Sequence, residues 1–175
     1  MPSTIEVFSD FVCPYYYLAE QLLADAVEGS EVHISWQSFE LRPEPTPTLR
    51  PEGDYLESTW VYPMAERMGV PIVLPRVSPQ PYGRLAFEGF AYAAEHGVGQ
   101  RYIRISGCSV RRWTPAATPR RTSRRYAAAH QQALRRAREL QITVVPTFLF
   151  DGRRLEGMPT AEGLHRLLIS AVARR

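Results

Sequence analysis

The pattern of apolar and polar positions predicts a strand, a helix and a second strand at the start of the chain. A short apolar run, Ile5 to Phe8, is typical of a buried strand. Residues 15–27 carry apolar side chains at helical spacing, with one stripe formed by Leu18, Leu22, Leu23 and Ala26. Apolar and polar residues alternate over 32–37, which predicts a strand. We therefore expect a βαβ unit with parallel strands and a right-handed crossover.

The end of the chain predicts two further strands and a helix. Residues 142–150 form a β-rich apolar run, and Pro146 inside it marks a strand start or an edge. Asp151-Gly152 is a strong hairpin turn, so 153–156 should be the returning strand. Thr160 can cap a last helix.

The pattern over residues 42–140 predicts a helical insertion between these two ends of the chain. Helical patterns cover 54–68, 84–96 and 124–140, and proline-rich connectors separate them. Pro63 should kink or divide the first of these helices. Residues 103–123 mix Ser, Thr, Pro and Arg without a helical period, so no regular structure is predicted there.

Size and composition predict one domain, or one domain with an insertion. The 175 residues are 45% hydrophobic, which supports an ordinary core. No run of about 18 apolar residues is present, so nothing is expected to span a membrane. The first residues enter a strand without a secretory pattern, and we expect a cytoplasmic location.

The positive charge is concentrated in one segment. All basic residues are Arg, and 97–138 contain no Asp or Glu. The Arg residues of this segment are 101, 104, 111, 112, 120, 121, 124, 125, 135, 136 and 138. Basic patches bind phosphate, but no nucleic-acid motif accompanies this one. A solvated helix face with a loose loop is favoured over a nucleic-acid site.

The chemistry-bearing stretch is Cys13-Pro14, directly after the first strand. Pro14 suits the first helical position, which puts Cys13 at the helix N-cap. There the sulfur would face orphan N–H groups and the positive end of the helix dipole, which favours the thiolate. The alternative is that Cys13 is a small buried apolar residue.

Other side chains offer no second site. Cys13 and Cys108 make no disulfide framework, and both should be thiols in a reducing compartment. The four His residues lack metal-ligand spacing, so we treat them as structural and predict no metal site.

Several short stretches resemble the DsbA-like family, in the FrnE-like branch close to 2-hydroxychromene-2-carboxylate isomerases. The matching stretches are 9–14 (SDFVCP), 39–43 (FELRP), 78–82 (SPQPY), 84–88 (RLAFE), 145–148 (VPTF) and 155–157 (LEG). The resemblance implies an α/β structure, a thioredoxin fold with an inserted helical subdomain. Residues 1–41 and 141–175 would form the thioredoxin-like domain, and 42–140 the insertion.

The resemblance also implies residue roles. Cys13 would be the exposed nucleophile, and Pro146 a cis-proline that holds the Val145 backbone toward a bound peptide or glutathione. The alternative for Pro146 is a trans proline that begins a strand. The substrate site would be lined by Pro14, Tyr15, Tyr16, Val145, Pro146 and Thr147.

Two departures from the family pattern matter. Redox members carry a second Cys three residues after the first, where this chain has Tyr16. Without it a mixed disulfide at Cys13 cannot be resolved locally, and Cys108 is a weak candidate for a remote resolver. The Tyr16 hydroxyl could bond the thiolate, or the ring could simply pack. Residues 103–123 also replace a longer acidic insertion, and we hypothesise that this passage is rearranged or out of frame.

The expected function is that of a monothiol thiol–disulfide oxidoreductase without a permanent cofactor. Glutathione would be a co-substrate, and the partners would be protein or small-molecule thiols and disulfides. One alternative is a glutathione-dependent isomerase or transferase, and another is a weakened peptide-binding protein. The oligomeric state is open, with a homodimer as one option.

Overall fold

The structure is a computed structural model, and it describes residues 3–50, 61–73, 78–106 and 124–172. The described elements, in chain order, are β1 (Thr4–Ser9), α1 (Pro14–Val27), β2 (His33–Ser38), α3 (Val61–Arg67), α4 (Arg84–Glu95), α5 (Gly99–Ser106), α6 (Arg124–Glu139), β3 (Thr147–Phe150), β4 (Arg153–Glu156) and α7 (Ala161–Val172).

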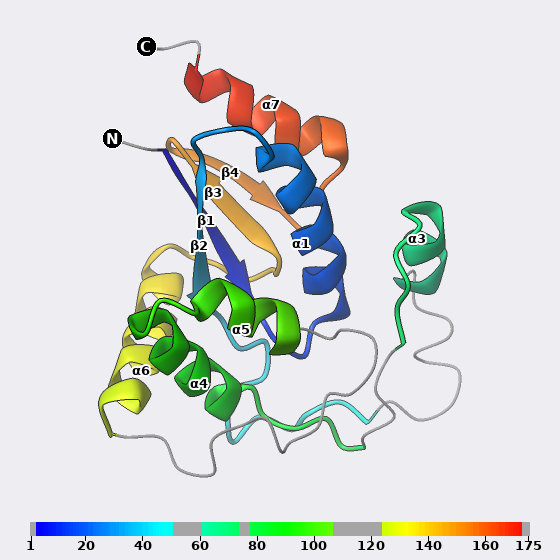
Figure 1. The fold of residues 1–175 in the computed structure, drawn as a ribbon. Coiled ribbons are helices and arrows are strands. Elements are labelled where there is room, and N and C mark those ends of the chain that lie inside the picture. Colours follow the sequence, from blue (N-terminus) through cyan, green and yellow to red (C-terminus); the bar gives the residue numbers. More distant parts are fainter. Residues whose placement is uncertain (1–2, 51–60, 74–77, 107–123, 173–175) are drawn as a thin grey trace.

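The four strands form one mixed sheet in the order β2-β1-β3-β4 (Figure 1). β1 and β2 are parallel, with Ile5 opposite Ile34, as the predicted βαβ unit requires. β3 runs antiparallel to β1, and β4 antiparallel to β3. The predicted α/β class, a thioredoxin fold with a helical insertion, is confirmed.

The helices form two groups around the sheet. α1 and α7 pack together beside the strands, whereas α4, α5 and α6 gather near the carboxyl ends of β1 and β2 (Figure 1). One hydrophobic core contains Ile5 and Phe148 of the sheet, Leu164 of α7, Phe87 of α4 and Ala137 of α6. The inserted helices therefore share a core with the sheet, and the boundaries at residues 41 and 141 stay predictions.

Prolines and caps position the elements much as the sequence predicts. α3 is described from Val61 onward and contains Pro63, and the first part of the helix predicted over 54–68 lies outside the described residues. β3 begins directly after Pro146, which confirms the predicted strand start. The Thr160 hydroxyl accepts a hydrogen bond from the N–H of Gly163 at 3.0 Å, which caps α7.

The prediction of irregular structure is wrong for residues 103–106, because α5 continues to Ser106. Ile103 is buried in the core, and its carbonyl oxygen accepts the Tyr16 hydroxyl at 3.5 Å. This helix is short, and Ile103 is buried by contacts with residues that are distant in the sequence. The rest of the segment, with Cys108 and the hypothesis of a rearrangement, lies outside the described residues.

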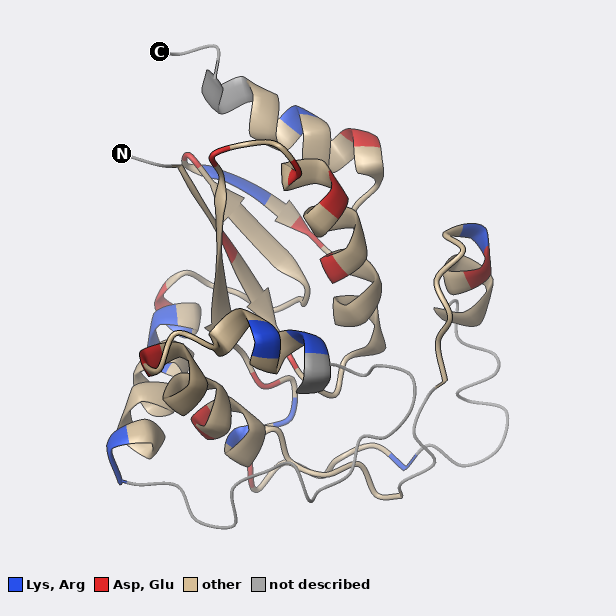
Figure 2. Ribbon diagram, in the orientation of Figure 1, with Lys and Arg blue, Asp and Glu red and all other residues tan. Residues whose placement is uncertain are grey.

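Several arginines of the basic segment form ion pairs with acidic residues from other parts of the chain. Figure 2 shows where acidic and basic residues lie along the ribbon. Arg104 on α5 lies 3.4 Å from Glu20 on α1. Arg136 on α6 lies 2.7 Å from Glu6 on β1. The described part of the chain contains no helix with the length and apolar character needed to cross a bilayer.

Candidate active site

Cys13 is the N-cap residue of α1, and Pro14 occupies the first turn of that helix. The Cys13 backbone is extended, with φ −88° and ψ 114°, and its N–H donates to the carbonyl oxygen of Asp10 at 3.0 Å. The thiol points toward the carbonyl oxygen of Val145, 3.9 Å from Sγ. The fold thus brings the start of α1 and the approach to β3 together.

The segment opposite Cys13 is held by its own hydrogen bonds. The Val145–Pro146 peptide bond is cis, and the Pro146 carbonyl oxygen accepts the N–H of Gly157 at 2.8 Å. The Thr147 hydroxyl donates to the carbonyl oxygen of Val144 at 2.6 Å. Val145, Pro146 and Thr147 are buried, whereas Val144 is exposed. Val144 is therefore an accessible side chain here that the sequence analysis missed.

The two tyrosines predicted to line the site lie in different environments. Tyr15 is half-buried, and it packs against both hydrophobic clusters of the described residues. Tyr16 is only 1% exposed and makes an edge contact with the Trp36 ring, 5.1 Å between centroids. The Tyr16 side chain therefore packs in the core, and its hydroxyl donates to the carbonyl oxygen of Ile103.

The sequence predicts that the Cys13 thiol is exposed and readily ionised, and the structure corrects both expectations. Cys13 is 6% exposed, and burial raises the pKa of its thiol to about 11. The negative charge of Asp10 raises this pKa further, and the N–H groups of Tyr15 and Tyr16 lower it. The helix amides do act as expected, but the loss of solvation outweighs them.

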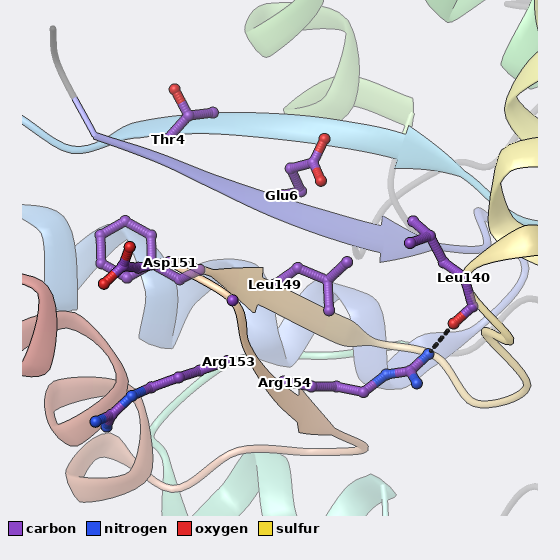
Figure 3. A pocket seen from close by; sticks show the side chains of 9 residues that line it. Thr4, Glu6, Leu140, Leu149, Asp151, Arg153 and Arg154 are labelled. Carbon is purple, nitrogen blue, oxygen red and sulfur yellow. Dashed lines mark hydrogen bonds between the residues drawn. The ribbon is translucent and has the colours of Figure 1, made fainter.

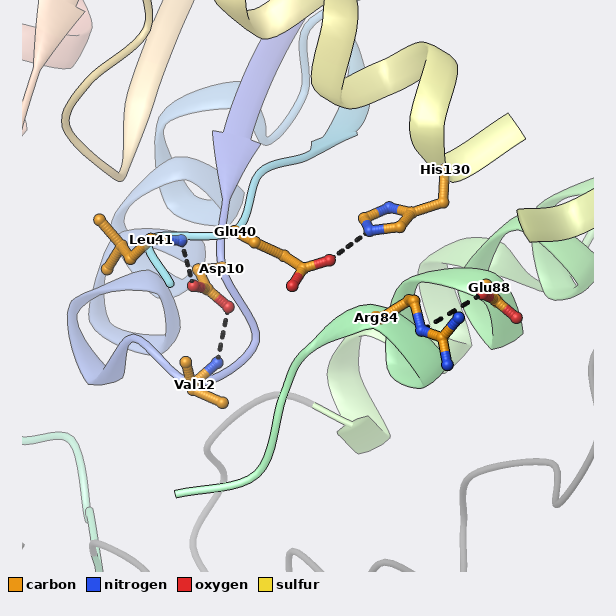
Figure 4. Close-up of polar contacts among 7 residues, drawn as sticks. All are labelled: Asp10, Val12, Glu40, Leu41, Arg84, Glu88 and His130. Atoms are coloured by element: carbon orange, nitrogen blue, oxygen red, sulfur yellow. Dashed lines mark hydrogen bonds and ion pairs between the residues drawn. The ribbon is translucent and has the colours of Figure 1, made fainter. Parts of the chain in front are cut away.

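Asp10 is a buried carboxyl group next to Cys13 in the same turn, and it is 1% exposed. Its carboxylate accepts the N–H of Leu41 at 2.8 Å and the N–H of Val12 at 3.2 Å (Figure 4). Burial raises the pKa of Asp10 to about 6, against the opposing effect of these two hydrogen bonds. The sequence analysis includes Asp10 only as part of the stretch 9–14 and predicts no role for it.

A second buried polar pair lies close to Asp10. Glu40, next to Leu41, is hydrogen-bonded to Nε2 of His130 on α6 (Figure 4). The His130 ring stacks on Phe87 of α4, with centroids 5.2 Å apart. This pair connects the segment after β2 with two inserted helices, which supports the interpretation of His130 as a structural residue.

Cys13 is absent from the walls of two hollows that described residues form. One of about 540 Å³ lies on the sheet beside the β3–β4 hairpin, with Glu6, Leu149 and Arg154 in its wall (Figure 3). The other, about 790 Å³, lies between the segment after β2 and α6, with Glu40 and Arg138 in its wall. Within the described ranges no group of three His, Cys, Asp or Glu side chains could hold a metal ion.

The chain belongs to the family of DsbA-like thioredoxin domains. Residues 4–105 match the model of the DSBA-like thioredoxin domain, and this range includes Asp10 and Cys13. The chain is also 35% identical, over 185 aligned residues, to the uncharacterized protein YwbO of Bacillus subtilis (strain 168). That alignment covers 87% of this chain and 89% of YwbO.

Solved structures support the same fold. The probable DsbA oxidoreductase SCO1869 from Streptomyces coelicolor matches 99% of this chain and 91% of its own, with a TM-score of 0.69 and 18% identity. For a 2-hydroxychromene-2-carboxylate isomerase the shares are 98% and 95%, the TM-score 0.67 and the identity 19%. The cytosolic disulfide reductase DsbM from Pseudomonas aeruginosa with GSH matches 97% of this chain and 99% of its own, with a TM-score of 0.62 and 15% identity. At these identities the likeness concerns the fold.

Proposed function

From the premise that the chain is a DsbA-like thioredoxin domain, we propose that it is a monothiol thiol–disulfide oxidoreductase linked to glutathione. The observation that carries this proposal is the position of Cys13, at the N-cap of α1 with Sγ 3.9 Å from the carbonyl oxygen of Val145. The structural similarity to a disulfide reductase solved with GSH supports the choice of glutathione.

The proposed reaction has two exchange steps. The Cys13 thiolate attacks one sulfur of a disulfide, forms a mixed disulfide and releases the other half as a thiolate. An external thiolate, such as that of glutathione, then attacks the mixed disulfide and releases Cys13 with a new disulfide as product. Tyr16 stands where a second Cys would resolve the intermediate, so the resolving thiol comes from solution. A reducing compartment such as the cytoplasm would supply it.

The raised pKa of Cys13 affects both steps. With a pKa of about 11, only about one thiol in ten thousand is ionised at pH 7, so the free enzyme attacks slowly. A thiol with a high pKa is also a poor leaving group, so the mixed disulfide persists once it has formed. Both effects favour a reductase or a carrier of a glutathione adduct over a rapid oxidant.

The test is the formation of a Cys13 mixed disulfide. The protein is incubated with oxidised glutathione at several pH values, and the modified peptide is quantified by mass spectrometry. We expect one adduct at Cys13, formed faster as pH rises and released by added reduced glutathione. Cys13→Ser should lose this adduct and Cys108→Ser should keep it. The absence of a Cys13 adduct at every pH would reject the proposal.

The buried, neutral thiol specifically favours a second candidate, a glutathione-dependent isomerase or transferase. A Cys13 S–H group can donate a hydrogen bond to the thiolate of bound glutathione, which would then be the reacting sulfur. The fold shared with a 2-hydroxychromene-2-carboxylate isomerase supports this candidate.

Calorimetry with reduced and with oxidised glutathione separates the two candidates. Saturable binding that survives Cys13→Ser supports the isomerase or transferase, because its chemistry does not need a covalent bond to Cys13. Binding that needs Cys13 and oxidised glutathione supports the oxidoreductase. A weakened binding protein would instead hold an extended peptide whether or not Cys13 is present.

A further inference from the structure

Asp10 lies where three segments of the chain meet. In the turn before α1, its backbone carbonyl oxygen accepts the N–H of Cys13, and its carboxylate accepts the N–H of Val12. The same carboxylate accepts the N–H of Leu41, just beyond β2 (Figure 4). At the start of α4, a Cβ added to Gly83 would lie 3.3 Å from the Asp10 carboxylate.

Few charges act on the Asp10 carboxylate within the described residues. Glu40 and Arg42, from the segment after β2, act on it with opposite signs. Glu40 is bonded to His130, and Arg84 at the start of α4 lies 3.9 Å from Glu88. Both described hydrogen-bond donors to Asp10 are neutral backbone N–H groups. The carboxylate is therefore buried in the turn that leads to Cys13, and it has no ion-pair partner among the described residues.

We infer that Asp10 is a positioning residue with two opposing effects on Cys13. Its hydrogen bonds hold the turn that places Cys13 at the start of α1, and its negative charge opposes the ionisation of the Cys13 thiol. Because the pKa of Asp10 lies at about 6, this charge is present at neutral pH and is removed by mild acid. The inference concerns the ionisation of Cys13 and needs neither glutathione nor a disulfide substrate.

The test compares Asp10→Asn, which removes the charge and one of the two acceptor oxygens, with Asp10→Glu, which keeps the charge and both oxygens on a side chain longer by one methylene. The rate of iodoacetamide modification of Cys13 is followed between pH 6 and 11 by mass spectrometry of the Cys13 peptide. We expect the midpoint for Asp10→Asn to fall by about one pH unit, which makes modification about tenfold faster at pH 8. Asp10→Glu should retain the wild-type midpoint.

A midpoint for Asp10→Asn equal to that of the wild type would overturn the inference. So would equal shifts in both variants, because a loosened turn alone would move them together. If a variant fails to fold, the wild-type protein supplies the test through nuclear magnetic resonance of the Asp10 carboxyl. Carboxymethylated Cys13, which is negative, should raise the Asp10 midpoint above that of carbamidomethylated Cys13, which is neutral. Equal midpoints in the two adducts would refute the inference.

Discussion

The sulfur of Cys13 lies 3.9 Å from the carbonyl oxygen of Val145, although 132 positions separate the two residues in the sequence. The contact is buried, so the sulfur lies against a carbonyl oxygen and is shielded from water. A thiolate would instead be stabilised by contact with water. A carbonyl oxygen accepts a hydrogen bond from S–H but repels a negative sulfur. The contact therefore agrees with the raised pKa of Cys13.

The ionisation of Cys13 should be observable directly. The thiolate absorbs in the ultraviolet more strongly than the thiol, so the difference in ultraviolet absorbance between wild type and Cys13→Ser reports the titration of Cys13. We expect almost no thiolate at pH 7 and a midpoint at about 11, because burial opposes the charged form. A midpoint below that of free cysteine, about 8.5, would contradict the structure.

Asp10 should make the free energy of unfolding depend on pH. Its pKa rises from 3.8 to about 6 on folding, so the folded state binds the proton more tightly. This contribution to stability is fully present below about pH 4 and is lost as pH rises through 6. Its size is about 3 kcal/mol. Between pH 4 and 7, wild type should lose about that much stability relative to Asp10→Asn.

Urea unfolding at several pH values measures this difference. Asp25→Asn is a matched control, because Asp25 is an exposed carboxylate on α1. Parallel pH profiles for wild type and Asp10→Asn would show that Asp10 does not titrate as the structure indicates.

Restoring the C-x-x-C spacing should be costly for the fold. Tyr16→Cys replaces a ring that is buried and contacts Trp36, so it leaves a cavity. We expect a loss of about 3 kcal/mol in the free energy of unfolding under reducing conditions. Tyr16→Phe keeps the ring and loses the bond to Ile103, so it should cost about 1 kcal/mol. Similar losses in both variants would argue against packing as the role of Tyr16.

Loss of the buried partner of Glu40 should strongly destabilise the protein. His130→Ala leaves the Glu40 carboxyl buried without its described side-chain partner, and we expect a loss of about 3 kcal/mol. In a separate cycle, the double variant Glu40→Leu with His130→Leu should cost less than the sum of the two single changes Glu40→Leu and His130→Leu. Thermal unfolding of the single and double variants tests this. Additive losses would mean that the two side chains are not coupled.

The local elements of this fold follow from the spacing of apolar residues and from the prolines and capping residues at the element ends. Pro14 after Cys13 places the start of α1, Pro146 the start of β3, and Thr160 the cap of α7. Each of these depends on backbone geometry within a few residues, which is why the sequence predicts it. The helix through residues 103–106 was not predictable in the same way, because Ile103 is buried by contacts with distant parts of the chain.

The sequence by itself determined where the four strands and the described helices other than α5 lie, and that a Cys begins the first helix. The tertiary structure decided whether that Cys is exposed, which charge lies beside it and which distant arginines find acidic partners. Solvation and Coulomb interactions depend on distances between residues that are far apart in the chain. For Cys13, the burial and the Asp10 charge that the fold supplies outweigh the helix amides that the sequence supplies.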